Sequence, residues 1–77
     1  MPLKELERAV LGAEVAGPLL RAGDVGVVVG VYRDGEAYEV EFFDADGTTL
    51  AVETLRADQV EPLAGRKILH VRTLTAA

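Results

Sequence analysis

Residues 21–32 have the sequence RAGDVGVVVGVY, and this stretch decides the fold. A turn that contains Gly23 and Asp24 runs directly into a valine-rich strand, residues 25–32. Gly23 is expected to supply a positive φ angle, and Asp24 can hydrogen-bond to the backbone of its own turn. Within the strand, Gly26 and Gly30 are typical of the bulges and strong coiling that a small closed barrel requires. Apolar residues on both faces indicate a central strand that is at least partly covered on both sides.

Alternating side chains predict a third strand after this one. The sequence RDG at residues 33–35 is typical of a hairpin tip, and the strand that follows it covers residues 38–43. Tyr38, Val40 and Phe42 share one face of this strand and are the expected core residues. Phe43 falls on the opposite face, with two glutamates.

The remaining strands are shorter or less regular. DADG at residues 44–47 predicts a tight turn before a fourth strand, residues 48–55, in which Leu50 and Val52 are expected to face the core. Leu55 is out of phase with these two, so a bulge is expected near residues 53–54. Residues 57–59 predict a single 3₁₀ turn before a last strand, residues 60–63, and residues 9–11 predict a first strand.

These elements predict an all-β fold, a small five-stranded SH3-like barrel with a short 3₁₀ turn. The expected organisation is an N-terminal polar segment (1–8), the barrel (9–63) and a basic C-terminal extension (64–77). Leu19 and Leu20 are apolar enough to close one end of the barrel. The extension is β-capable from Ile68 to Leu74, because no breaker interrupts it.

The residue inventory excludes most kinds of enzyme. The 77 residues contain no cysteine, serine or asparagine and a single histidine, so one chain cannot assemble a Ser-His-Asp or Cys-His arrangement. His70 is interpreted as an exposed or interfacial side chain. We therefore expect no catalytic activity, no cofactor and no metal. Lys4 to Arg8 is charged and lacks a signal-peptide core, and no apolar run approaches the roughly 20 residues of a membrane helix, so a cytoplasmic protein is expected.

Charge is unevenly distributed along the chain. The first 65 residues carry a balance of −8 and the last twelve carry +3, which together give the net −5. An acidic body repels nucleic acid and anionic lipid, so neither nucleic acid nor membrane is an expected partner. The basic tail is expected either to dock on its own barrel or on another copy, as a homodimer, or to remain a frayed terminus. The candidate residues for self-association are Ile68, Leu69, Val71 and Leu74.

Acidic side chains on the third and fourth strands and in the turn between them suggest a binding surface. If the two strands pair, these acids form one patch around an exposed aromatic ring, which suits a basic protein partner. The alternative is a solvated face that keeps a sheet edge soluble. The candidate protein-binding residues are Glu39, Glu41, Phe43, Asp44, Asp46 and Glu53.

Three short sequences carry a resemblance to a known family: LRAGDVGVV at residues 20–28, YEVEF at 38–42 and ADQV at 57–60. With these the chain resembles the DUF4926 family of small bacterial proteins of unknown function over roughly residues 9–63. The resemblance implies an SH3-like barrel and an antitoxin-like or immunity-like role, and it supplies no catalytic residues. The opening of the second strand is also similar to KOW motifs of ribosomal and transcription factors.

The expected function is that of a non-catalytic protein-interaction module, an antitoxin-like or immunity-like partner of a basic protein. A KOW-type nucleic-acid-binding module is one alternative. An accessory subunit of a larger enzyme is another, and it rests on fold analogy alone.

Overall fold

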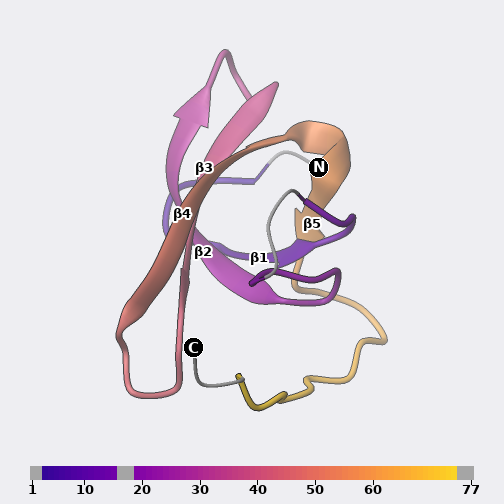
Figure 1. Ribbon diagram of the computed structural model, residues 1–77. Helices are drawn as coiled ribbons and strands as arrows, with labels where there is room; N and C mark the ends of the chain where they lie inside the picture. The colour runs from indigo at the N-terminus through magenta and orange to yellow at the C-terminus, as the bar shows by residue number, and fades with distance from the viewer. Residues whose placement is uncertain (1–2, 16–18, 75–77) are drawn as a thin grey trace.

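The computed structural model describes residues 3–15 and 19–74. Five strands are present in these residues, and a 3₁₀ turn, η1 (Ala57–Gln59), separates the last two (Figure 1). The strands are β1 (Arg8–Leu11), β2 (Val25–Tyr32), β3 (Ala37–Phe43), β4 (Thr49–Arg56) and β5 (Val60–Pro62). All pair antiparallel in one sheet, in the order β4-β3-β2-β1-β5. The predicted fold class, all-β with five strands and one 3₁₀ turn, is confirmed.

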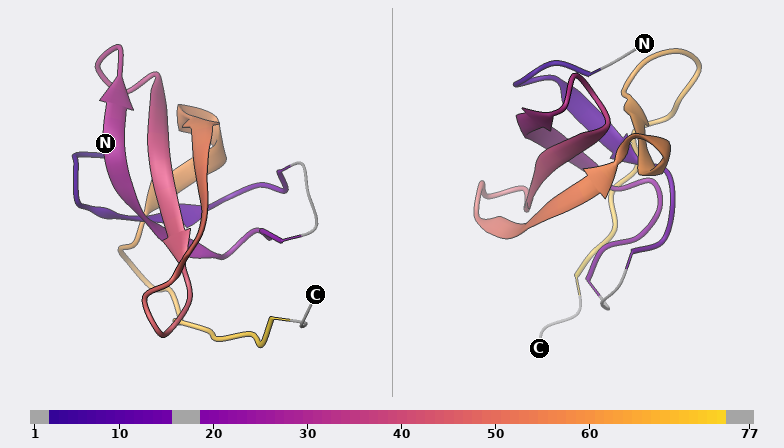
Figure 2. Two further views of the ribbon diagram at one scale, coloured as in Figure 1. Left: turned by 60° about the vertical axis from the view of Figure 1, so that its left-hand side comes forward. Right: turned by 90° about the horizontal axis from the view of Figure 1, so that it is seen from above.

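The sheet is rolled up and not flat. Figure 2 shows β1 running across the direction of the β2–β3 hairpin, with β5 continuing beyond it. The first and last strands are therefore neighbours although about fifty residues separate them, with Leu11 opposite Val60. The register of β2 against β3 shifts between Val28 and Gly30, which places a bulge at Val29. A bulge of this kind increases local twist and lets a short sheet close.

The core lies inside the curled sheet. Val28 and Val40 are directly opposite each other on β2 and β3, and both have 0% of their surface exposed. Tyr38 and Phe42 extend this buried row along β3, as the alternation predicted. The other buried residues are Leu3, Ala9, Leu11, Leu20 and Leu55. Of the two residues expected to close one end of the barrel, Leu20 is buried and Leu19 is partly buried.

The prediction of which residues of the fourth strand face the core is wrong. Val52 is 50% exposed and Leu50 is only partly buried, whereas Leu55 belongs to the core with 2% exposed. The register explains this result, because Phe42 pairs with Ala51 but Phe43 pairs with Thr49, which leaves Leu50 as an extra residue. The bulge therefore lies at Leu50, near the start of β4, and not near residues 53–54. Since strand side chains alternate, one extra residue moves every later side chain to the other face.

The second strand is central in the sheet, fully covered on one face and only partly covered on the other. Gly26 and Val28 point inward and are buried. On the other face Val27 is partly buried, whereas Val25 and Val29 are 36% and 40% exposed, so the expected covering of this face is only partial. Among the described residues, no helix has the length and apolar character that a membrane crossing requires.

Candidate functional site

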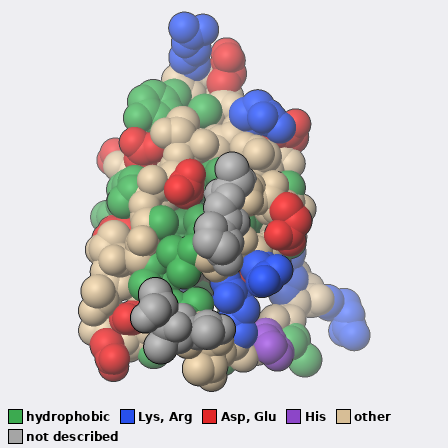
Figure 3. Space-filling model, viewed as in Figure 1, with side chains coloured by type: hydrophobic (Ala, Val, Ile, Leu, Met, Phe, Trp, Pro, Cys, Tyr) green, Lys and Arg blue, Asp and Glu red, His purple; other side chains and the backbone are tan. Residues whose placement is uncertain are grey.

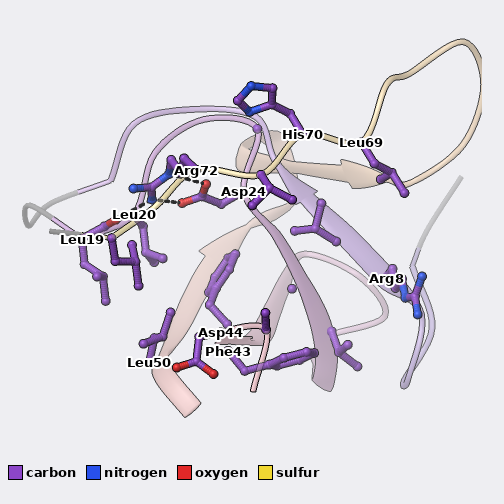
Figure 4. Close-up of a pocket in the computed structure, with 18 of the residues that line it drawn as sticks. Arg8, Leu19, Leu20, Asp24, Phe43, Asp44, Leu50, Leu69, His70 and Arg72 are labelled. Atoms are coloured by element: carbon purple, nitrogen blue, oxygen red, sulfur yellow. Dashed lines mark hydrogen bonds and ion pairs between the residues drawn. The ribbon is translucent and has the colours of Figure 1, made fainter. Parts of the chain in front are cut away.

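A cleft of about 430 Å³ opens at the end of the barrel where β2 begins and β3 ends (Figure 4). Its wall on the barrel side is mostly apolar and combines β2, β3, β4 and the loop before β2. The apolar side chains of this wall include Leu19, Leu20, Val25, Val27, Phe43 and Leu50. The other wall is the C-terminal tail, residues 64–74, which contributes Leu69, Val71 and Arg72. The cleft thus combines distant parts of the chain.

One ion pair joins the tail to the barrel across this cleft. The Arg72 guanidinium donates from Nε to Oδ1 of Asp24 at 3.0 Å and from Nη2 to Oδ2 at 2.6 Å (Figure 4). Nη2 also donates to the backbone carbonyl of Leu19 at 2.7 Å. Two parallel bonds to one carboxylate are the strong, geometrically selective form of an arginine contact.

The turn before β2 holds Asp24 in place. Gly23 has a φ of +96°, and the Arg21 N–H donates to Oδ2 of Asp24 at 2.8 Å, so both sequence predictions for this turn are confirmed. The backbone of the turn is tied to β1, because the Leu11 N–H donates to the carbonyl of Asp24 at 2.8 Å. In the other direction, the Gly23 N–H donates to the carbonyl of Leu11 at 2.7 Å. The carboxylate is therefore preorganised by the barrel itself and not by the tail.

The electrostatics of the pair favour the ionised carboxylate. Burial alone would raise the pKa of Asp24, but hydrogen bonds from Arg72 and from the Arg21 backbone, together with the charges of these two arginines, outweigh burial and lower that pKa. The hydrogen bond to Asp24 raises the pKa of Arg72 in turn. About a third of the Arg72 side chain and a fifth of that of Asp24 remain exposed, so solvent screens the pair in part.

The tail makes few other contacts with the barrel. Lys67 Nζ lies 3.4 Å from a carboxylate oxygen of Glu61, and the Lys67 N–H donates to the Gly65 carbonyl inside the tail. Although the extension is β-capable from Ile68 to Leu74, residues 64–74 contain no strand. Of the residues expected to mediate self-association, Leu74 is partly buried, whereas Ile68, Leu69 and Val71 are 90%, 68% and 86% exposed. His70 is exposed as well.

The acidic residues predicted to form one patch are divided among three places. Glu39 and Glu41 lie on the outer face of β3, where hydroxyl groups satisfy them: Thr54 and Tyr32 donate to Glu39, and Thr49 donates to Glu41. The hydrogen bond to Glu39 and its negative charge raise the pKa of Tyr32. These two glutamates are thus partly committed to holding β2, β3 and β4 together.

The other predicted residues lie elsewhere. Phe43 is 43% exposed and lines the cleft with Asp44, whose Oδ1 accepts from the backbone N–H of Asp46 and of Thr48, both at 2.9 Å. Asp46 is exposed in this turn. Glu53 pairs directly with Val40, and since residues opposite each other share a face, it lies on the inner side of the sheet, away from Glu39 and Glu41.

Sequence reasoning therefore missed the ion pair between Asp24 and Arg72. The signal that could have found them was the excess of positive charge after Gly65, which needs an acid on the barrel if the tail docks there. Among residues 3–15 and 19–74, no group of three or more histidine, aspartate and glutamate side chains is arranged to hold a metal ion.

Comparison with known proteins assigns a family to the barrel but does not extend to the tail. The family model DUF4926, a domain of unknown function, matches residues 5–62, which include Asp24 but not Arg72. No curated protein and no solved structure matches the chain significantly. Because the matched residues form well over half of the 77-residue chain, it belongs to the DUF4926 family.

Proposed function

We propose that this chain is a non-catalytic protein-interaction module that binds an extended, basic and partly apolar segment of a partner protein in the cleft. One observation carries the proposal: Asp24, which the barrel preorganises, already holds the guanidinium of an extended segment there. The chain's own tail thus displays the chemistry that the cleft accepts.

The cleft offers two kinds of interaction to such a segment. Two of its apolar side chains, Phe43 and Val25, are more than a third exposed and would lose contact with water on binding. The carboxylate of Asp24 fixes a basic side chain in one orientation. A few oriented polar groups among apolar walls are typical of a site that combines affinity with specificity.

The charge of the whole molecule favours a basic partner. The net −5 attracts a cationic protein at long range and raises the rate of encounter. On the face shown in Figure 3, acidic side chains lie near exposed hydrophobic ones at several places. An acidic chain that covers a basic surface acts in the manner of an antitoxin or immunity protein, and this is the role we propose within the cytoplasm.

The proposal is tested by titrating the ¹⁵N-labelled full chain with a panel of peptides in which apolar and basic residues alternate. A matched panel with glutamate in place of each basic residue is the control. Amide shifts are expected at Val25, Val27, Phe43 and Leu50 with the basic panel only. Equal shifts with both panels, or shifts confined to the outer face around Glu39, would contradict the proposal.

A further inference from the structure

We propose that Asp24 and the Leu19 carbonyl form an arginine-recognition site for the partner's segment, and that Arg72 is a tethered competitor that occupies this site until the partner displaces it. This inference rests on the proposed function, because it names the side chain that the cleft selects and the regulation of the same cleft. The occupant we infer is an arginine-bearing segment of a basic protein.

Geometry makes the site selective for arginine. Three acceptor oxygens, two from the Asp24 carboxylate and one from Leu19, receive hydrogen bonds from Nε and Nη2 of one guanidinium. A lysine ammonium donates from a single nitrogen and cannot span a carboxylate with two parallel bonds. Replacement of arginine by lysine at this position therefore removes directed hydrogen bonds while it preserves the charge.

The tail is held weakly enough to be displaced. Among the described residues, no backbone hydrogen bond joins residues 66–74 to the barrel. Three apolar tail side chains, Ile68, Leu69 and Val71, keep more than two thirds of their surface exposed. The Asp24 pair is thus the principal polar anchor beyond Lys67, and a segment that also buries apolar side chains would outcompete it.

The connection to the barrel lets the tail leave without disturbing the sheet. The last backbone hydrogen bond before the tail runs from the Leu63 N–H to the Arg8 carbonyl at 3.4 Å. Gly65 follows with a φ of +81° and no atom within 4 Å of the position of a Cβ, so the chain bends there without packing constraints. Asp24 stays fixed by Arg21 and Leu11 when Arg72 departs, so the empty site keeps its shape.

Charge favours a basic protein over a second copy as the displacing partner. Two copies of this chain each carry −5 and repel each other, whereas a cationic protein is attracted. A second copy is also a weaker competitor for the site. The short flexible tether keeps each chain's own Arg72 at a local concentration in the millimolar range, which is much higher than the concentration of another copy's tail in solution. A partner segment needs additional apolar contacts to displace it, and the cleft provides the surface for them.

The experiment measures binding of a fluorescent peptide with the sequence of residues 66–74, RKILHVRTL, to the full-length chain and its variants. Arg72→Ala should bind it about tenfold more tightly than the natural chain, since the competing tail no longer fills the site. Arg66→Ala removes the same charge from an exposed tail residue and should change binding little.

Asp24→Asn should weaken binding at least about tenfold, whereas Asp34→Asn, at the exposed tip of the β2–β3 hairpin, should not. A peptide with lysine in place of the arginine at position 72 should bind the natural chain as weakly as the natural peptide binds the Asp24→Asn variant.

The outcomes separate this inference from the function on which it rests. If the peptide binds in the cleft but Arg72→Ala and Arg66→Ala behave alike, the competitor role is wrong while the interaction function stands. If Asp24→Asn binds as tightly as the natural chain, the arginine site is wrong. Sedimentation of the natural chain at micromolar concentration adds a last arm: a dimer that is already stable there and that dissociates on Arg72→Ala would make a second copy the occupant and overturn the assignment to a basic partner.

Discussion

Gly23 and Gly26 both resist substitution, for different physical reasons. Gly23 has open space around it, but its φ of +96° is a conformation that other residues adopt at a cost. Gly26 has an ordinary backbone, but a Cβ would lie 2.7 Å from the Glu41 carbonyl oxygen and 2.7 Å from Cγ1 of Val40. The positive φ expected at Gly23 is therefore present, whereas Gly26 resists a side chain because β3 approaches it closely.

Substitution of Gly26 tests the close approach. Gly26→Ala is expected to lower the free energy of unfolding by about 1–3 kcal/mol, because the methyl group must push β2 away from β3. Gly12→Ala is the control, since its nearest contact would be the Gln59 carbonyl oxygen at an ordinary 3.5 Å. Denaturant midpoints of the two variants give the comparison, and equal midpoints would show that the sheet yields easily at Gly26.

Three valines test the core. Val28→Ala and Val40→Ala remove methyl groups from fully buried side chains and should each cost about 1–3 kcal/mol. Val52→Ala makes the same change at a side chain that is 50% exposed and should cost less than about 0.5 kcal/mol. Urea unfolding monitored by circular dichroism measures all three. A loss at Val52 as large as that at Val28 would mean that the outer face is covered in solution.

Among the elements, β3 was predictable from the sequence and β4 was not. The alternation of Tyr38, Val40 and Phe42 continues without interruption, so period and face follow directly. In β4 the extra residue at Leu50 inverts the alternation, and nothing in the local sequence separates a bulge at Leu50 from one three or four residues later. Only the pairing with β3 decides, and pairing is a long-range property.

The charge distribution along the sequence predicted that the tail could dock on the barrel, but the sequence did not reveal which residues make the contact. The positive tail on an acidic body indicates docking, but Asp24 is one of 13 acids and its turn was explained by a backbone role. The fold brings residues 48 positions apart into contact at the open end of the barrel. Conversely, Glu39 and Glu53 lie on the neighbouring strands β3 and β4. Their side chains are nevertheless on opposite faces of the sheet, because Leu50 is an extra residue in β4.

Acid should release the tail element from the barrel. Docking lowers the pKa of Asp24, so the docked state binds fewer protons than the released state, and docking is favoured above the ordinary aspartate pKa of about 3.9 and lost as the pH falls through the lowered value. Relaxation of the backbone amides at positions 69–74 should show increased motion only below about pH 4. Asp24→Asn should show a mobile tail at every pH. A rigid tail in that variant would mean that apolar contacts hold it.

At the scale of the whole molecule, we expect nucleic acid to be an unfavourable partner. Two of the three basic tail residues already face acids, Lys67 near Glu61 and Arg72 on Asp24, so the tail offers little free positive charge to a phosphate backbone. No micromolar complex with duplex DNA or RNA is expected at about 150 mM salt. Fluorescence anisotropy with labelled oligonucleotides measures this. Tight binding that weakens steeply as salt is added would favour the KOW-type alternative.

The last prediction concerns self-association through the tail. Two copies can exchange tails, so that each Arg72 binds the other copy's Asp24, and Gly65 supplies the hinge. Exchange keeps the same ion pairs, and it gains stability only if Ile68, Leu69, Val71 and Leu74 bury more surface between two copies than in one. The tethered Arg72 competes at a local concentration in the millimolar range, so a dimer should appear only as the protein itself approaches about 1 mM.

Sedimentation velocity from about 10 µM to about 1 mM should therefore show a monomer that dimerises only at the upper end. Asp24→Asn should abolish this dimer, because it removes the contact that exchange preserves, while Asp34→Asn should leave it unchanged. A dimer already stable at micromolar concentration would mean that the four apolar tail residues find a surface between copies that one chain does not offer. A dimer that survives Asp24→Asn would show that those residues, and not the ion pair, determine where the tail binds.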